Sequence, residues 1–155
     1  MRVSELCNLR WRHVIRRANG VQLDISSGKG DKQRHVLLPE SSWSVLSAIR
    51  EEVPDTDFVF RSRQEVSRHG HYKGTRLDTT TVFRIVREAA KRAGVKNWQE
   101  VSPHWLRHCH GSHAIDHHAP LTVVRDTLGH SNIAVTNEYA KARPDQSSST
   151  FLPIE

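Results

Sequence analysis

The spacing of apolar residues changes along the chain, and this change most constrains the fold. In the first forty residues, apolar side chains occur in short runs typical of strands, whereas most of the remainder has them three and four positions apart, as on one face of a helix. Turns containing glycine separate the short runs. The expected strands are residues 11–15, 21–25 and 34–38. We therefore expect a mixed, mainly α fold with a small three-stranded antiparallel sheet.

Several helices are expected around this sheet, and most have a recognisable start or end. Asp78 is a good N-cap, and Gly94 would end the helix that follows it. Ser102 and Pro103 favour the start of another helix, and Gly129 favours the end of the next. The expected helices are residues 3–10, 41–53, 79–93, 104–117, 121–128 and 133–141.

The chain is basic, with 23 Lys and Arg against 17 Asp and Glu, a formal net charge of +6 and a pI near 9.8. Such a charge favours a polyanionic partner, because Lys and Arg displace counterions from phosphates. Many proteins with a similar pI bind no nucleic acid, so the charge alone does not identify the partner. The polar segment 61–76 carries five Lys or Arg against Glu65. It fits either a solvated loop or a segment lying along a phosphate backbone.

Two classes of protein are excluded by what the sequence lacks. No apolar run approaches the roughly 18 residues of a membrane span, and Glu5 and Asn8 occupy positions where a secretory signal would need apolar residues. Cys7 and Cys109 are too few for a disulfide framework or a four-thiolate zinc site.

With 155 residues the chain suits one domain. We expect no membrane association and, by default, a reducing cytoplasmic location.

Histidines concentrate after residue 103 and raise zinc binding as an alternative. His104 with His108, and His113 with His117, have the i, i+4 spacing that can chelate zinc. The segment has no H-E-x-x-H motif and no carboxylate third ligand at a recognisable position. We therefore expect no metal, and His108, His117 and His118 also fit a solvated or DNA-facing surface.

A second set of polar residues is a candidate for phosphodiester chemistry. His104 and Arg107 are three residues apart on one expected helix, so their side chains share a face and could meet one phosphate. His130 follows the glycine that ends a helix, and Tyr139 lies nine residues further on. Each residue alone fits an ordinary core or surface position. Together they form a plausible centre for attack on a phosphodiester.

These residues resemble the motifs of the tyrosine recombinases, the phage integrase family. The sequence HWLR at 104–107 is similar to the H-x-x-R box, LGH at 128–130 to the L-G-H box, and Tyr139 to the nucleophilic tyrosine. Earlier in the chain, RVSEL at 2–6 is similar to the first arginine box, and GKGDK at 28–32 together with Arg34 is similar to the β-turn lysine box. The five boxes occur in the family's order and span nearly the whole chain.

The resemblance implies a site-specific DNA recombinase or integrase that cuts and rejoins strands. Tyr139 would attack the scissile phosphorus and leave a 3′-phosphotyrosyl bond and a free 5′-hydroxyl. Arg2 and Arg107 would hold the non-bridging oxygens, on which negative charge grows in the transition state. Because the phosphotyrosine conserves the bond for rejoining, no nucleotide cofactor is expected.

Three further residues receive roles from the same resemblance. Lys29 would protonate the leaving 5′-oxygen, and His104 would act as the acid-base partner of the phenol. His130 would donate a hydrogen bond to the phosphate. Arginine and lysine charges would take the place of a divalent metal ion.

The resemblance also implies partners and a domain organisation. The expected partners are double-stranded DNA and other recombinase protomers in a tetrameric synapse. Residues 1–143 would be a catalytic domain without its first helix and without the family's core-binding domain, and residues 144–155 a tail in which Phe151 and Leu152 pack into an apolar groove. The residues expected to bind DNA are Lys32, Arg34, Arg61, Arg63, Arg68, Lys73 and Arg76.

Two alternatives remain open. A truncated, non-catalytic DNA-binding remnant would have the same fold and the same boxes. A type IB topoisomerase-like enzyme would use similar chemistry without choosing a site, although the short chain and the L-G-H box favour the recombinase.

Overall fold

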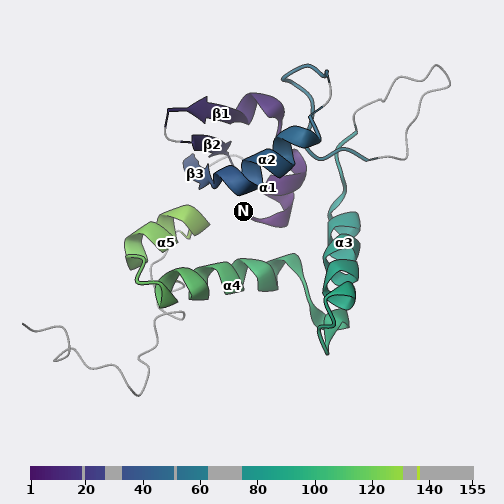
Figure 1. Ribbon diagram of the computed structural model, residues 1–155, viewed down its shortest axis with the longest axis vertical. Helices are drawn as coiled ribbons and strands as arrows, with labels where there is room; N and C mark the ends of the chain where they lie inside the picture. The colour runs from purple at the N-terminus through teal and green to yellow at the C-terminus, as the bar shows by residue number, and fades with distance from the viewer. Residues whose placement is uncertain (19, 27–32, 51, 63–74, 131–135, 137–155) are drawn as a thin grey trace, which may run out of the picture. The chain divides into compact units, whose positions relative to one another are not determined.

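The computed structural model describes residues 1–155 except 19, 27–32, 51, 63–74, 131–135 and 137–155 (Figure 1). The chain divides into two compact units, residues 1–108 and 109–155. The elements in chain order are α1 (Val3–Asn8), the 3-10 helix η1 (Trp11–His13), β1 (Val14–Arg17), β2 (Gly20–Ile25), β3 (Arg34–Leu38), α2 (Glu40–Ala48), α3 (Thr79–Arg92), the 3-10 helix η2 (Trp98–Glu100), α4 (Pro103–Asp116) and α5 (Leu121–Leu128). The mixed, mainly α fold is confirmed.

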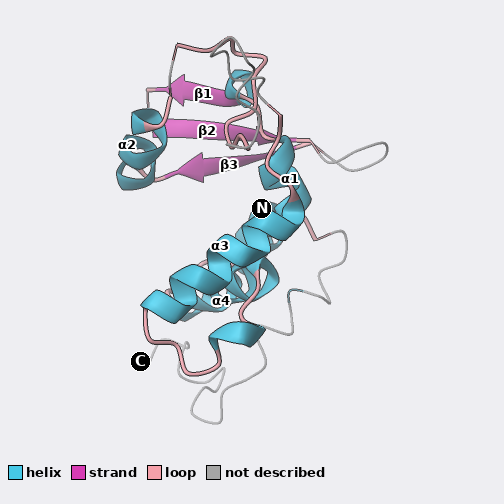
Figure 2. Cartoon of the chain, turned by 90° about the vertical axis from the view of Figure 1, so that its right-hand side faces the viewer, coloured by secondary structure: helices cyan, strands magenta, loops and turns pink. Residues whose placement is uncertain are grey.

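The three strands form one antiparallel sheet in the order β1-β2-β3 (Figure 2). Alternate residues of the central strand, Val21, Leu23 and Ile25, are buried, while the intervening Gln22 and Asp24 are partly exposed. This alternation follows from the two-residue period of a strand, which points successive side chains to opposite faces. The expected three-stranded sheet is therefore confirmed.

The core of the first unit lies against the buried face of this sheet. Helix α2 packs on β2 and contributes Leu46. The Val59 N–H donates to the Leu9 carbonyl at 2.9 Å and so joins a distant segment to the end of α1. The buried core residues are Leu9, Trp11, Val21, Leu23, Ile25, Leu46 and Val59.

The first strand begins later than its sequence predicts. Residues 11–13 form η1, and the strand covers only Val14–Arg17. The Trp11 N–H donates to the Asp57 carbonyl at 3.1 Å, and the Arg12 N–H to the Asp55 carbonyl at 2.8 Å. These long-range bonds hold the backbone out of the sheet, so the expected strand start at residue 11 is wrong.

Helix α2 is shorter than its apolar spacing predicts, because it ends at Ala48 and not near residue 53. The Ser44 and Ser47 hydroxyls donate to the carbonyls of Ser41 and Ser44 at 2.8 and 3.1 Å. Serines that bond their own backbone in this way weaken a helix. The Arg50 N–H then closes the final turn on the Ser47 carbonyl at 3.0 Å.

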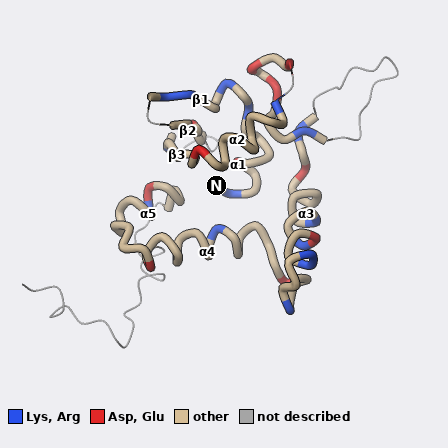
Figure 3. The backbone as a smooth tube through the Cα atoms, in the orientation of Figure 1, with Lys and Arg blue, Asp and Glu red and all other residues tan. Residues whose placement is uncertain are grey.

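The next helices follow their predicted boundaries closely. The Asp78 carboxylate accepts from the Thr81 N–H at 2.9 Å and from its hydroxyl at 2.6 Å, which caps α3. Helix α3 carries both basic and acidic residues (Figure 3) and contacts α1 and η2. The Ser102 hydroxyl accepts from the Trp105 N–H at 3.3 Å at the start of α4. Apart from Thr136, the expected helix 133–141 lies outside the described residues, as do the tail and the 143–144 boundary.

The two cysteines have opposite environments. Cys7 on α1 is 2% exposed, whereas Cys109 on α4 is exposed. Burial raises the pKa of the Cys7 thiol, with a smaller opposing effect from Arg76.

Within the described ranges, no helix combines the length and apolarity that crossing a bilayer requires.

Candidate functional site

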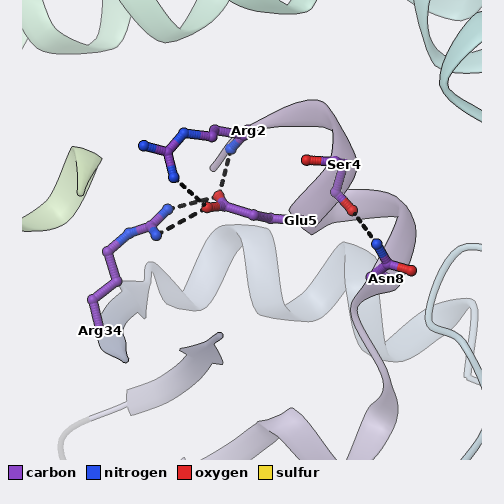
Figure 4. A network of polar contacts seen from close by, with 5 residues as sticks. All are labelled: Arg2, Ser4, Glu5, Asn8 and Arg34. Atoms are coloured by element: carbon purple, nitrogen blue, oxygen red, sulfur yellow. Dashed lines mark hydrogen bonds and ion pairs between the residues drawn. The ribbon is translucent and has the colours of Figure 1, made fainter. Parts of the chain in front are cut away.

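The buried carboxylate of Glu5, at the start of α1, accepts hydrogen bonds from two arginines (Figure 4). Arg34 binds Glu5 through two hydrogen bonds, from Nη1 to Oε1 at 3.0 Å and from Nη2 to Oε2 at 2.7 Å. Arg2 reaches the same group twice, from its backbone N–H to Oε2 at 2.6 Å and from Nη1 to Oε1 at 3.3 Å. Glu5 occupies the first turn of α1, where an acid can reach back to the preceding backbone N–H.

The three side chains differ sharply in their exposure to solvent. The Glu5 side chain is 3% exposed and that of Arg34 is 9% exposed, whereas that of Arg2 is 41% exposed. A carboxylate this deeply buried needs paired charge and hydrogen bonds, and the two-pronged Arg34 contact supplies both. Arg2 is therefore held by the buried Glu5 carboxylate, while its guanidinium remains accessible to solvent.

Arg107 lies close to this group. Its side chain comes from α4 and is buried, with 8% of the residue exposed. The pKa of the Met1 α-amino group is lowered by burial first and then by the positive charge of Arg107, with smaller lowering effects from Arg34 and Arg2. Glu5 acts in the opposite direction. The positive charges of Arg107, Arg34 and Arg2 and the negative charge of Glu5 thus all act on the Met1 α-amino group, where the excess of positive charge favours an anion.

His104 lies one helical turn before Arg107 and contacts His108. Their Nε2 atoms are 2.7 Å apart, and the rings meet edge to face at 85°. Partial burial, followed by the charges of His108 and Arg107, lowers the pKa of His104 below its ordinary value of 6.5. The neutral imidazole is therefore favoured near pH 7, and a neutral imidazole can accept a proton.

His130 belongs to the second unit, and the end of α5 fixes its position. The Gly129 N–H donates to the Asp126 carbonyl at 3.1 Å, and the His130 N–H donates to the Arg125 carbonyl at 3.1 Å. This pair of bonds is the Schellman motif, and Gly129 adopts the left-handed conformation, with φ of 68°, that the motif needs. His130 Nδ1 then lies 3.0 Å from Oγ1 of the fully buried Thr136.

The residues expected to bind DNA have different surroundings. Arg61 and Arg76 pair as an antiparallel bridge at the two ends of the basic segment, and Arg76 donates to Asn8 Oδ1 at 2.9 Å. Arg34, in contrast, is buried against Glu5 instead of lying on the surface. The site residues that lie outside the described part of the chain are Lys29, Lys32, Arg63, Arg68, Lys73 and Tyr139.

Glu5 contacts Arg2 and His108 contacts His104, although sequence reasoning gave neither Glu5 nor His108 a catalytic role. An acid three residues after a helix N-cap is a recognisable capping signal, and it would have identified the bond from Glu5 to the Arg2 backbone. No local signal links Glu5 to Arg34, which is 29 residues away in sequence. Among the described residues, no three His, Cys, Asp or Glu side chains come together as a metal site.

Comparison with known proteins gives a consistent family assignment. The chain is 34% identical over 139 residues to a tyrosine recombinase of Thermosipho africanus, with 90% of this chain and 44% of that protein covered. It is 33% identical over 160 residues to tyrosine recombinase XerD of Chlamydia pneumoniae, with 98% of this chain and 48% of that protein covered. The chain thus spans about half the length of the curated relatives it matches.

Solved structures agree with the observed fold. The crystal structure of XerA recombinase superposes with a TM-score of 0.72 at 28% identity, covering 97% of this chain and 50% of that one. XerH site-specific recombinase bound to its difH substrate has the same fold, with a TM-score of 0.73 at 23% identity over 98% of this chain and 42% of that one. Residues 1–146 match the profile described as the phage integrase family. On this match the chain belongs to the phage integrase family.

Proposed function

We propose that this chain is the catalytic part of a site-specific recombinase that breaks and rejoins DNA strands through Tyr139. The observation that carries the proposal is that the charges of Arg2 and Arg107 both act on the Met1 α-amino group at the start of α1, with His104 one turn from Arg107. A phosphodiester in transfer gains negative charge on its non-bridging oxygens, and fixed guanidinium groups stabilise that charge. Family membership supplies the expectation that the anion is the scissile phosphate of DNA.

Each step of the proposed reaction has a residue to carry it. The Tyr139 oxygen attacks phosphorus and its proton passes to His104, whose lowered pKa favours the neutral, proton-accepting form. The bond from phosphorus to the 5′-oxygen breaks, and Lys29 donates a proton to that oxygen. His130 donates a hydrogen bond to the phosphate, and its position after the Gly129 turn supports this role.

The proposal includes partners and domains. Residues 1–143 form the catalytic domain and residues 144–155 a tail, and the partners are double-stranded DNA and other protomers in a tetrameric synapse. Two observations support DNA as the substrate: the net charge of +6, and the DNA-bound state of the XerH structure, which has the same fold.

A nicked suicide duplex provides the first test, because loss of the small downstream fragment traps the covalent adduct. The chain should form a phosphotyrosyl adduct that survives denaturation, and Tyr139→Phe should abolish it while changing DNA affinity less than about twofold. Tyr72→Phe is the matched control and should leave the adduct intact, since Tyr72 is the other tyrosine in the chain.

The alternatives give different results in the same assay. Adduct formation by the Tyr139→Phe variant would remove Tyr139 from its role. A wild-type chain that binds DNA and forms no adduct would support the non-catalytic remnant. Relaxation of a supercoiled plasmid without any target site would indicate a topoisomerase.

A further inference from the structure

We propose that Arg34 is a positioning residue that orients Arg2 through the shared carboxylate of Glu5. The inference rests on the proposed function, in which Arg2 holds the phosphate. Arg34 is the first residue of β3 and Glu5 lies on α1, so their contact joins the sheet to the helix that follows Arg2.

The hydrogen bonds of Glu5 support an indirect effect of Arg34 on Arg2. Arg34 occupies both carboxylate oxygens, at 3.0 and 2.7 Å, and the planar guanidinium therefore fixes the plane of the carboxylate as well as its position. The same oxygens receive the backbone N–H and the Nη1 of Arg2 (Figure 4). A change in the orientation of Glu5 must then move both contacts of Arg2.

Arg34 differs from an ordinary surface arginine because its side chain is buried. Its side chain is 9% exposed, whereas Arg16 on β1 pairs with Glu40 while 58% exposed. Replacing a buried ion pair with apolar residues is often neutral or even stabilising, so stability alone is a weak reason for such a pair. The orientation of Arg2 is a stronger reason for the buried pair. Arg2 is half-exposed, and its long side chain would otherwise sample many rotamers.

The decisive measurement follows the order of the Arg2 side chain and needs no catalytic activity. In the ¹⁵N-labelled chain, the Arg2 Nε–H signal is assigned by its loss in Arg2→Lys, and its heteronuclear NOE is compared between variants. Arg34→Lys keeps the charge and removes the two-pronged contact, so the NOE of Arg2 should fall to the level of exposed arginines. Arg16→Lys makes the same substitution in an exposed pair on the same sheet and should leave the Arg2 NOE unchanged.

Cleavage kinetics then test the consequence for the reaction. In single-turnover reactions, Arg34→Lys should lower the cleavage rate by about tenfold or more while DNA affinity changes less than about threefold, because misplacement of a positioned group reduces rate more than binding. Added to Arg2→Lys, the same substitution should cause no further loss, since both residues act through one contact. Arg16→Lys should cleave as the wild type does.

The outcomes separate this inference from the proposed function. An unchanged Arg2 NOE in folded Arg34→Lys overturns the inference. The inference is also overturned if Arg34→Lys lowers the cleavage rate by the same factor in the wild-type chain and in the Arg2→Lys variant. If Arg34→Lys does not fold, Arg34→Gln replaces it and should cause the same loss of Arg2 order, because it leaves Glu5 and its contacts with Arg2 in place. A wild-type chain without cleavage activity counts against the proposed function, and the NOE still decides the role of Arg34.

Discussion

The contact between His104 and His108 places a chemical constraint on the proposed acid-base residue. With the two Nε2 atoms 2.7 Å apart, one ring must donate a proton and the other must accept it. Two imidazolium ions cannot keep this contact, because each would present a proton and a positive charge to the other. Partial burial first, and then the charges of His108 and Arg107, lower the pKa of His104.

Replacement of His108 should therefore change the titration of His104. In His108→Gln the charge beside His104 is lost, and the pKa of His104 should rise toward 6.5, measured from its ring proton shifts by NMR. His110→Gln removes an exposed histidine from the same helix and serves as the control. A pKa of His104 that stays constant or falls in His108→Gln would contradict the assignment.

The same shift affects stability in a defined direction. A histidine whose pKa is lowered by folding binds its proton more readily in the unfolded chain, so the free energy of unfolding should decrease as pH falls below about 6.5. His108→Gln should reduce this pH dependence, and urea titrations at several pH values measure it.

At the level of elements, three helices end with a residue in the left-handed conformation. After α3, the Gly94 and Val95 N–H groups donate back to Lys91 and Ala90, and φ of Gly94 is 72°. Helix α5 ends in the same way at Gly129, and His118, the second residue after α4, adopts a similar left-handed φ of 62°. Of these ends, the one at Gly129 positions a residue of the proposed reaction, because His130 supplies the last N–H of the motif.

This similarity provides a matched pair of glycine variants. Gly94→Ala and Gly129→Ala each place a Cβ at positive φ, and each should lower the free energy of unfolding by about 1–2 kcal/mol. Only Gly129→Ala should also reduce cleavage, since it moves His130 away from Thr136. Denaturant unfolding and the suicide-duplex assay measure the two effects, and equal cleavage losses in both variants would assign the effect to stability alone.

The elements also show how far local signals extend. Asp78, Pro103 and Gly129 act within one turn of their own backbone, so the sequence alone predicted the ends of α3, α4 and α5 within about a residue. The late start of β1 and the burial of Arg34 depend on partners tens of residues away, at Asp57 and Glu5. The expectation that Arg34 binds DNA took no account of Glu5, because a basic residue gives no sign in the sequence of the carboxylate that it will meet.

At the scale of the whole molecule, the excess of positive charge is the feature most relevant to DNA. The net charge of +6 includes the five basic residues of segment 61–76, whose ends are joined by the Arg61–Arg76 bridge. The bond from the Ser62 N–H to the Thr75 carbonyl joins the two ends to each other, and the bond from Arg76 to Asn8 attaches one end to α1. Contacts from this segment to phosphates would release counterions and make affinity dependent on salt.

Salt titration should show this directly. A triple variant with Gln at positions 63, 68 and 73 should reduce the slope of log affinity against log salt concentration by roughly 3, about one for each lost phosphate contact. A comparison variant with Gln for the exposed Arg84, Arg92 and Lys96 removes the same charge elsewhere and should change the slope less. Equal slopes for the two variants would mean that only total charge matters and that the basic segment has no special contact with DNA.

The unequal environments of the two cysteines give the chain a built-in site for chemical labelling. Thiol reagents react with the thiolate, and the Cys7 thiol is both buried and shifted toward its protonated form. The exposed Cys109 lies two residues after Arg107, on the helix that also carries His104. A dye, spin label or crosslinker directed at thiols therefore attaches selectively beside the proposed catalytic residues, and the approach of a nucleic acid to α4 becomes observable without altering the sequence.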